Sequence, residues 1–272
     1  MNMMRFTTMK TKLRKYPSIF LILLLAISSC FLTGCVNQHP KDSKKSSQGE
    51  SVETMLEITD PKEKQAVLNA KAKVKALSGN PRIVATSPAV ADICDKLDLD
   101  LVGVPKSSVS KIPSRYKKVK KVGLAMSPDM EIVSSLNPDW ILAPSSLETD
   151  LKPKFEELKN TEYAFLNLRS VQGMYRSVQE LGEIFGKQQE AEKMTKEFTT
   201  FYKSYTKRNK NKKHPKVLVL MGLPGSYVIA TENSYVGSLV KLAGGENVYQ
   251  NTDQEFLTVN TEDMKKKEPE IT

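Results

Sequence analysis

The feature that most constrains the fold is an alternation of short apolar stretches with helical patterns between residues 81 and 144. Three apolar stretches predict buried strands: RIVAT at 82–86, LVGV at 101–104 and WILAP at 140–144. PAVADICDKLDL (88–99) predicts a helix after the first strand, and SPDMEIVSSL (127–136) predicts one before the third. Strands that alternate with helices form a mostly parallel sheet covered on both faces. We therefore expect an N-terminal α/β lobe over residues 81–170.

A different pattern begins at residue 171. Apolar residues recur there at every third or fourth position as far as Tyr205, with an interruption at Gly186. This spacing predicts a helical linker over 171–213, and its second part, from Gln188 to Lys207, would span roughly 30 Å. The expected fold class is α/β, with two Rossmann-like lobes joined by one long helix.

A second, partial α/β lobe is expected over residues 214–272. PKVLVLMG (215–222) predicts a strand, LPGSYVIATENS (223–234) a hairpin or loop, and YVGSLVKLAGG (235–245) a helix that ends at a glycine.

One element recurs in both lobes, namely a helix, a proline, an acidic residue and a strand. Glu131 lies seven residues before Pro138, and Glu262 lies seven residues before Pro269. Glu270 then marks the place where the next strand of the second lobe should begin. Because the sequence ends at Thr272, we expect the second lobe to be incomplete and the chain to be C-terminally truncated. A complete shorter protein is the alternative, and it would leave an open sheet edge.

Residues 1–35 have the pattern of a lipoprotein signal peptide. Five basic residues precede the nine-residue apolar run IFLILLLAI (19–27), which is too short to span a bilayer as a helix of roughly 20 residues. LTGC (32–35) resembles a bacterial lipobox, in which Cys35 becomes the lipidated first residue on the outer face of the cell membrane. An ordinary signal peptide or an anchor helix is the alternative. Residues 36–80 are expected to form a polar tether with a short helix from Pro61.

Cysteine content and charge exclude several classes of protein. Cys30 would leave with the signal and Cys35 would carry lipid, so Cys94 remains alone and no disulfide framework or cysteine metal site is expected. The net charge of +10 includes five basic and no acidic residues of the signal, so residues 36–272 carry +5. KRNKNKKHPK (207–216) is interpreted as a solvated helix end and loop, and no nucleic-acid partner is expected. Nothing in the sequence has the pattern of a catalytic constellation, so no enzyme is predicted.

Two lobes, one long helix and a lipobox resemble the class III substrate-binding proteins of iron-complex and cobalamin ABC importers. Two segments are similar to the haem-receptor lipoproteins of Gram-positive bacteria in particular: IPSRYKKVKKVGLAMSPDMEIV (112–133) and VLVLMGLPGSYVIATENSYVGSLVKLAGGENV (217–248). The resemblance implies a receptor that takes haem b from cell-surface donor proteins and delivers it to an ABC permease. The alternatives are a receptor for a ferric siderophore or a corrinoid, and a truncated product without a transport role.

The resemblance also implies an iron ligand. In that group a Met of the first lobe and a His of the second hold the haem iron, and Met126 matches the Met position. Without the resemblance, a single Met among eleven would be interpreted as core packing. A neutral thioether suits this role, because it is a soft, weak ligand that favours reduced iron. The family's His follows the strand expected at Glu270; neither His39 nor His214 fits that position.

Other residues are candidates for contacts with the cargo or with the permease. Backbone N–H groups at a helix start suit haem propionates, and the candidate donors and ring contacts are Thr86, Ser87, Ala89, Ser107, Ser108, Lys111 and Tyr227. Ordinary capping and turn chemistry is the alternative for each of them. In related importers one Glu on each lobe docks onto the permease, and Glu131 and Glu262 match that scheme. The alternative is that both are solvated helix carboxylates.

Overall fold

The computed structural model describes residues 5–6, 52–223 and 225–272. Cys35, His39, nearly all of the predicted signal peptide and residues 36–51 of the predicted tether therefore lie outside the described residues. Among the described residues, no helix is both long and apolar enough to cross a membrane.

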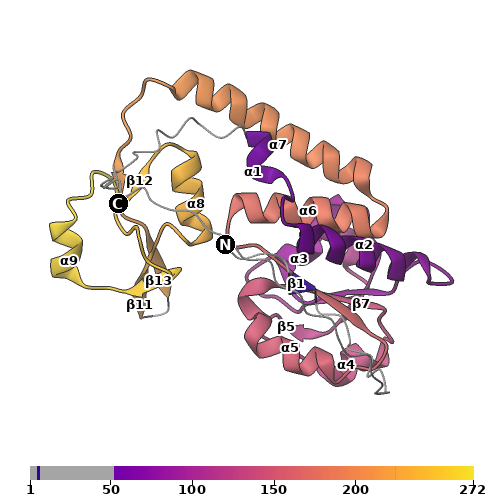
Figure 1. The fold of residues 1–272 in the computed structure, drawn as a ribbon. Helices are drawn as coiled ribbons and strands as arrows, with labels where there is room; N and C mark the ends of the chain where they lie inside the picture. Colours follow the sequence, from indigo (N-terminus) through magenta and orange to yellow (C-terminus); the bar gives the residue numbers. More distant parts are fainter. Residues whose placement is uncertain (1–4, 7–51, 224) are drawn as a thin grey trace, which may run out of the picture. The chain divides into compact units, whose positions relative to one another are not determined.

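The first lobe contains the elements from β1 to β8 (Figure 1). They are β1 (Arg5–Phe6), α1 (Val52–Leu56), α2 (Pro61–Lys75), β2 (Ile83–Ala85), α3 (Pro88–Lys96), β3 (Leu101–Val104), the 3-10 helix η1 (Ser114–Tyr116), β4 (Lys120–Lys121), β5 (Gly123–Leu124), β6 (Ser127–Pro128), α4 (Met130–Ser135), β7 (Trp140–Pro144), the 3-10 helix η2 (Ser145–Leu147), α5 (Glu148–Glu156) and β8 (Glu162–Leu166).

The linker and the second lobe make up the rest of the chain. They comprise α6 (Val171–Phe185), α7 (Gln188–Asn209), β9 (Lys216–Val217), β10 (Leu220–Leu223), β11 (Ser226–Ala230), α8 (Tyr235–Leu242), β12 (Glu246–Asn247), β13 (Phe256–Thr258) and α9 (Thr261–Lys266). Gly186 has a φ of 71° and separates α6 from α7, which confirms the predicted long linker helix after a break.

The first lobe is built on a parallel sheet, as the alternation of strands and helices predicts. Within the described residues its strand order is β1-β8-β7-β2-β3-β4, and only β1 runs antiparallel to its neighbour. β1 lies in the predicted signal peptide, so cleavage before Cys35 would remove this edge strand.

Side chains alternate between the two faces of this sheet, which gives the lobe two apolar layers. On one face, Ile83 and Leu142 pack with buried residues of α2, α3 and α6. On the other face, Val84 and Ile141 pack with α4 and α5. Helices thus cover both faces, as Figure 1 shows.

Helix α2 belongs to the lobe rather than to a tether. Pro61 opens it, and the Asp60 side chain accepts a hydrogen bond of 2.7 Å from the Lys62 backbone N–H, as predicted. Val67 and Ala70 are nevertheless buried in the core layer that also contains α6. The lobe therefore begins before residue 81, because a short apolar stripe suffices when a neighbouring helix covers it.

Three predicted element boundaries are wrong. The helix from Pro88 ends at Lys96, because Asp98 adopts a left-handed φ of 52°. Ser127 and Pro128 form strand β6, and α4 begins only at Met130. The strand predicted at 215–222 is divided into β9 and β10, which pair with different partners.

The second lobe combines a parallel and an antiparallel unit. β9 pairs in parallel with β12, while β10, β11 and β13 form an antiparallel sheet with the expected hairpin between β10 and β11. A small core of Leu218, Ile229 and Tyr249 holds this lobe.

The repeated helix–Pro–acidic–strand element is confirmed by matching hydrogen bonds. In the first lobe the Arg82 N–H donates to the Asp139 carboxylate at 2.7 Å, and the Asp139 N–H donates back to the Arg82 carbonyl at 2.9 Å. In the second lobe the Lys216 N–H approaches the Glu270 carboxylate at 3.4 Å, and the Glu270 N–H donates to the Lys216 carbonyl at 2.9 Å. Both copies thus use the acidic residue to start a parallel strand pair.

Candidate functional site

Met126 lies at the tip of a two-stranded hairpin. β5 and β6 pair antiparallel, and Ala125 and Met126 form the turn between them. Gly123 has a φ of +98°, and a Cβ on it would lie 2.9 Å from the Asp129 backbone nitrogen. A glycine is therefore required at the base of the hairpin, since side chains rarely adopt this φ and would collide with the chain.

Backbone hydrogen bonds join the hairpin to the edge of the parallel sheet. The Val122 N–H donates to Val104 at 2.9 Å, and the Lys106 N–H donates to Gly123 at 2.6 Å. The Asp129 N–H donates to Val122 at 2.7 Å, and the Asp129 side chain then caps α4 through the Ile132 N–H. The turn that carries Met126 is thus held from both sides.

The Met126 side chain is not part of the core, because 73% of its surface is exposed. Leu124 in the same hairpin is 58% exposed. Single exposed apolar side chains are common on protein surfaces, so exposure shows that Met126 is accessible but does not by itself assign it a role. The alternative interpretation of Met126 as core packing is therefore wrong.

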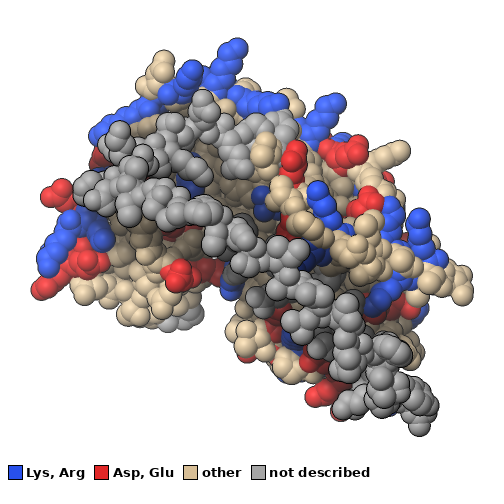
Figure 2. Space-filling model, viewed as in Figure 1, with Lys and Arg blue, Asp and Glu red and all other residues tan. Residues whose placement is uncertain are grey.

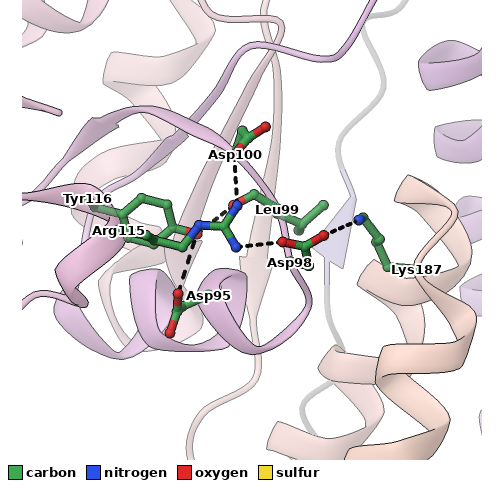
Figure 3. Close-up of polar contacts among 7 residues, drawn as sticks. All are labelled: Asp95, Asp98, Leu99, Asp100, Arg115, Tyr116 and Lys187. Carbon is green, nitrogen blue, oxygen red and sulfur yellow. Dashed lines mark hydrogen bonds and ion pairs between the residues drawn. The ribbon is translucent and has the colours of Figure 1, made fainter. Parts of the chain in front are cut away.

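A cluster around Arg115 holds the chain just before β4 (Figure 3). The Arg115 guanidinium lies 2.7 Å from Asp98 and 2.8 Å from Asp100, and Asp98 also lies 3.0 Å from the Lys187 ammonium. Hydrogen bonds from these two cations hold the pKa of Asp98 below its ordinary value. The buried Tyr116 hydroxyl donates to the Leu99 carbonyl at 2.5 Å. The start of β4, and with it the Met126 hairpin, is anchored to the turn between α3 and β3.

The sheet topology changes direction between β2 and β7, at the carboxyl ends of these two strands. The chain leaves β2 for α3 on one face and leaves β7 for α5 on the other, which is the switch point where open α/β sheets bind ligands. Thr86 and Ser87 follow β2, as expected, but both are buried. The Thr86 hydroxyl donates to Leu142 at 3.3 Å, and the Ser87 hydroxyl accepts from the Val90 N–H. The exposed Ala89 backbone therefore offers the more accessible donor at this helix start.

The loop after β3 carries the other candidate polar groups of the first lobe. Ser108 and Lys111 are exposed, and the Ser107 hydroxyl accepts a hydrogen bond of 3.0 Å from the Ser110 N–H. This loop leaves the sheet at the same edge as Ala89, because both follow the carboxyl ends of parallel strands.

Tyr227 lies in the second lobe, on β11 opposite Gly222. It is 59% exposed, so its ring is available for a contact. Among the described residues no side-chain hydrogen bond links it to the first lobe.

His214 does not occupy a ligand position. Its Nδ1 lies 2.7 Å from the Gly244 carbonyl, beside the end of α8 and at the amino end of β9. The carboxyl end of a parallel strand, where ligands bind, is the opposite end. In the described part of the chain, no group of three or more His, Cys, Asp or Glu could hold a metal ion.

Glu131 and Glu262 occupy equivalent helix positions in the two lobes. Each is the second residue of a short helix, α4 or α9, whose cap is Asp129 or Asn260. Both glutamates are exposed, and among the described residues neither takes part in an ion pair within 4.0 Å. Carboxylates in the first turn also suit the helix dipole, so the alternative of two solvated helix carboxylates stands beside docking.

Cys94 of the first lobe and Glu180 of α6 are buried groups whose pKa is strongly raised. Cys94 is buried, and burial raises the pKa of its thiol to about 12, so the thiol stays neutral. Burial, and next the neighbouring Glu63, raise the pKa of Glu180 well above its ordinary value. Sequence reasoning missed this carboxyl pair, because α2 and α6 are far apart along the chain.

A polar hollow of about 530 Å³ lies at the carboxyl end of β8. It is lined by Asn167, Arg169, Ser170, Glu232, Asn233, Asp253 and Glu255. The Arg169 guanidinium lies 2.6 Å from the Glu255 carboxylate. Such a lining is too polar for the flat apolar face of a porphyrin, and none of the predicted site residues belongs to it.

A family model described as periplasmic binding protein matches residues 83–272. The high-affinity heme uptake system protein IsdE of Staphylococcus aureus strain Newman is 40% identical over 195 residues. That match covers 71% of this chain, and the chain spans 66% of the length of that relative.

Solved structures similar to this one include two bacterial proteins. An ABC transporter substrate-binding protein from Listeria monocytogenes EGD-e has a TM-score of 0.66 and 45% identity, with 71% of this chain and 74% of that chain covered. S. aureus IsdE complexed with heme has a TM-score of 0.65 and 39% identity, with 71% and 75% covered.

Proposed function

The chain belongs to the periplasmic binding protein family, and from this premise we propose that it is a haem-binding receptor of an ABC importer. The protein would be anchored through lipid on Cys35 at the outer face of the cell membrane. It would take haem from cell-surface donor proteins and pass it to the permease. The family consists of binding proteins, and we propose no catalytic activity for this member.

The observation that carries the proposal is the exposed Met126 at the tip of a well-anchored hairpin. A thioether that is 73% exposed is available to an iron atom, and the backbone hydrogen bonds of the hairpin hold the turn that carries it. The Ala89 N–H and the Ser107–Lys111 loop lie at the same carboxyl edge and are the proposed partners of the propionates. Tyr227 is the proposed ring contact from the second lobe. The relative whose structure contains heme supports this cargo over other iron complexes.

A haem titration of the purified protein tests the cargo. We expect a saturable shift of the haem absorption band at one haem per chain. A ferric siderophore and cobalamin, offered separately under the same conditions, should give no saturable binding. Tight binding of either of them without haem binding would overturn the proposed cargo while leaving the family unchanged.

We further propose that Glu131 and Glu262 dock onto basic residues of the permease. Their equivalent placement in the two lobes supports a two-point contact. Glu131→Gln and Glu262→Gln should each weaken binding to the permease of the same importer by about tenfold, the effect of removing one interfacial charge. Haem titration of both variants should match the unchanged protein.

The matched control is Glu157→Gln, an exposed carboxylate next to the end of α5. It should leave binding to permease-containing membrane vesicles unaltered. Equal losses in all three variants would indicate a general charge effect and would exclude a two-point dock.

A further inference from the structure

The C-terminal half of α7 carries a concentrated positive charge that the proposed haem site does not use. From Phe198 to Lys213 the sequence has six basic residues and no acidic residue. Lys213 lies 2.5 Å from Glu270 and forms an ion pair with it. The other basic residues of this stretch are Lys203, Lys207 and Arg208 in α7, and Lys210 and Lys212 just after its end. All five are exposed, and we call them the α7 basic face.

Helical spacing gathers this charge on one side of α7. Lys203, Lys207 and Lys210 are three and four residues apart, so their side chains project on the same side. The opposite side packs inward, where Phe198 stacks on Tyr175 of α6 with ring centroids 4.5 Å apart. Figure 2 shows Lys and Arg side chains gathered along the edge over α7. The charge therefore faces away from the packed interior.

An exposed aromatic ring accompanies the α7 basic face. Phe201 is 61% exposed and lies seven residues before Arg208, so the two share a line along the helix. Basic residues with an exposed aromatic at their border are typical of helices that lie on anionic bilayers.

We propose that the α7 basic face docks on anionic phospholipid headgroups of the membrane that carries the protein. This inference rests on the proposed lipid anchoring at Cys35, which confines the chain near the bilayer and raises the effective concentration of headgroups. Lipid headgroups fit better than a soluble polyanion, because Phe201 can enter the interfacial layer while the lysines contact phosphates. Docking by α7 fixes how the receptor lies before it meets the permease.

Lysine acylation in vesicles tests this contact. The lipidated full chain is reconstituted in vesicles of phosphatidylcholine, or of equal parts of phosphatidylcholine and phosphatidylglycerol. We expect the acylation rate of the lysines of the α7 basic face to fall by about fivefold in the anionic vesicles. This factor is the preference for an anionic surface that a single Lys or Arg near it confers. High salt should reverse the protection, since it screens exposed charges. Lys64 and Lys159, exposed outside α7, should react equally in both vesicles.

Two variants and one competitor make the result decisive. Lys207→Glu with Lys210→Glu should abolish protection of Lys203 and Lys212, whereas Lys64→Glu with Lys159→Glu, an equal charge change elsewhere, should preserve it. Equal acylation of the α7 lysines in both vesicles overturns the proposal. Protection by soluble polyphosphate, with none by anionic vesicles, overturns it in favour of a polyanion. A chain that fails to float with neutral vesicles refutes the lipid anchor instead, and haem titration remains a separate readout.

Discussion

Replacing Met126 by leucine is expected to weaken haem binding by at least about tenfold, the loss that corresponds to ~1.4 kcal/mol of coordination. Leucine keeps the size and apolar character of the side chain but has no sulfur to offer the iron. The absorption signature of a thioether-ligated haem should disappear in Met126→Leu and in Met126→Ala alike. Both variants should keep the stability of the unchanged protein, because the side chain is 73% exposed.

Leu124→Ala is the matched control for Met126. It removes a similarly exposed apolar side chain from the same hairpin and should leave the iron spectrum unaltered. A leucine variant that binds haem with unchanged affinity and spectrum would show that Met126 serves as an apolar contact and not as a ligand. Weaker haem binding by Leu124→Ala, with the thioether spectrum retained in the bound form, would assign part of the affinity to the apolar surface of the hairpin.

Apolar periodicity predicts the parallel core of the first lobe well, because these strands are buried on both faces. The predicted bounds of LVGV and WILAP match β3 and β7. The same periodicity cannot show a change of partner, so the apolar run 215–222 concealed the break between β9 and β10. Apolar periodicity also placed α2 in the tether, because the apolar stripe of that helix is narrow. The helix is buried only because α6 covers this stripe.

The candidate site was partly predictable for a different physical reason. Turn chemistry locates Met126 between a strand and a capped helix, but composition cannot tell an exposed methionine from a buried one. Exposure depends on the hydrogen bonds from Lys106 and Asp129 that close the hairpin. The Arg115 cluster depends on the left-handed Asp98 turn, which no apolar pattern reveals.

The second large expected effect concerns Glu180 and the pH dependence of the free energy of unfolding. Its side chain is fully buried on α6, beside Glu63 of α2, and the nearby Arg176 donates instead to the Met55 carbonyl at 2.6 Å. Burial first, and then Glu63, raise the pKa of Glu180 in the folded protein well above its value in the unfolded chain. Unfolding therefore releases a proton between these two pKa values. With respect to this group, the free energy of unfolding is highest below the ordinary carboxyl pKa of 4.5. It falls as the pH rises from there toward the pKa of the folded state.

Glu180→Gln is consequently expected to stabilise the protein at pH 8 by about 1–3 kcal/mol and to have little effect near pH 4. The amide cannot ionise, and its NH2 group can donate to the Glu63 carboxylate. Urea unfolding at the two pH values measures both effects. Glu183→Gln, one turn away, is the matched control: hydrogen bonds from Lys71 and then Gln188 lower the pKa of Glu183, so this variant should lose at most about 1 kcal/mol at pH 8. If Glu180→Gln instead destabilises the protein at pH 8, Glu180 is an ionised partner of Arg176, and its pKa in the folded protein is not raised.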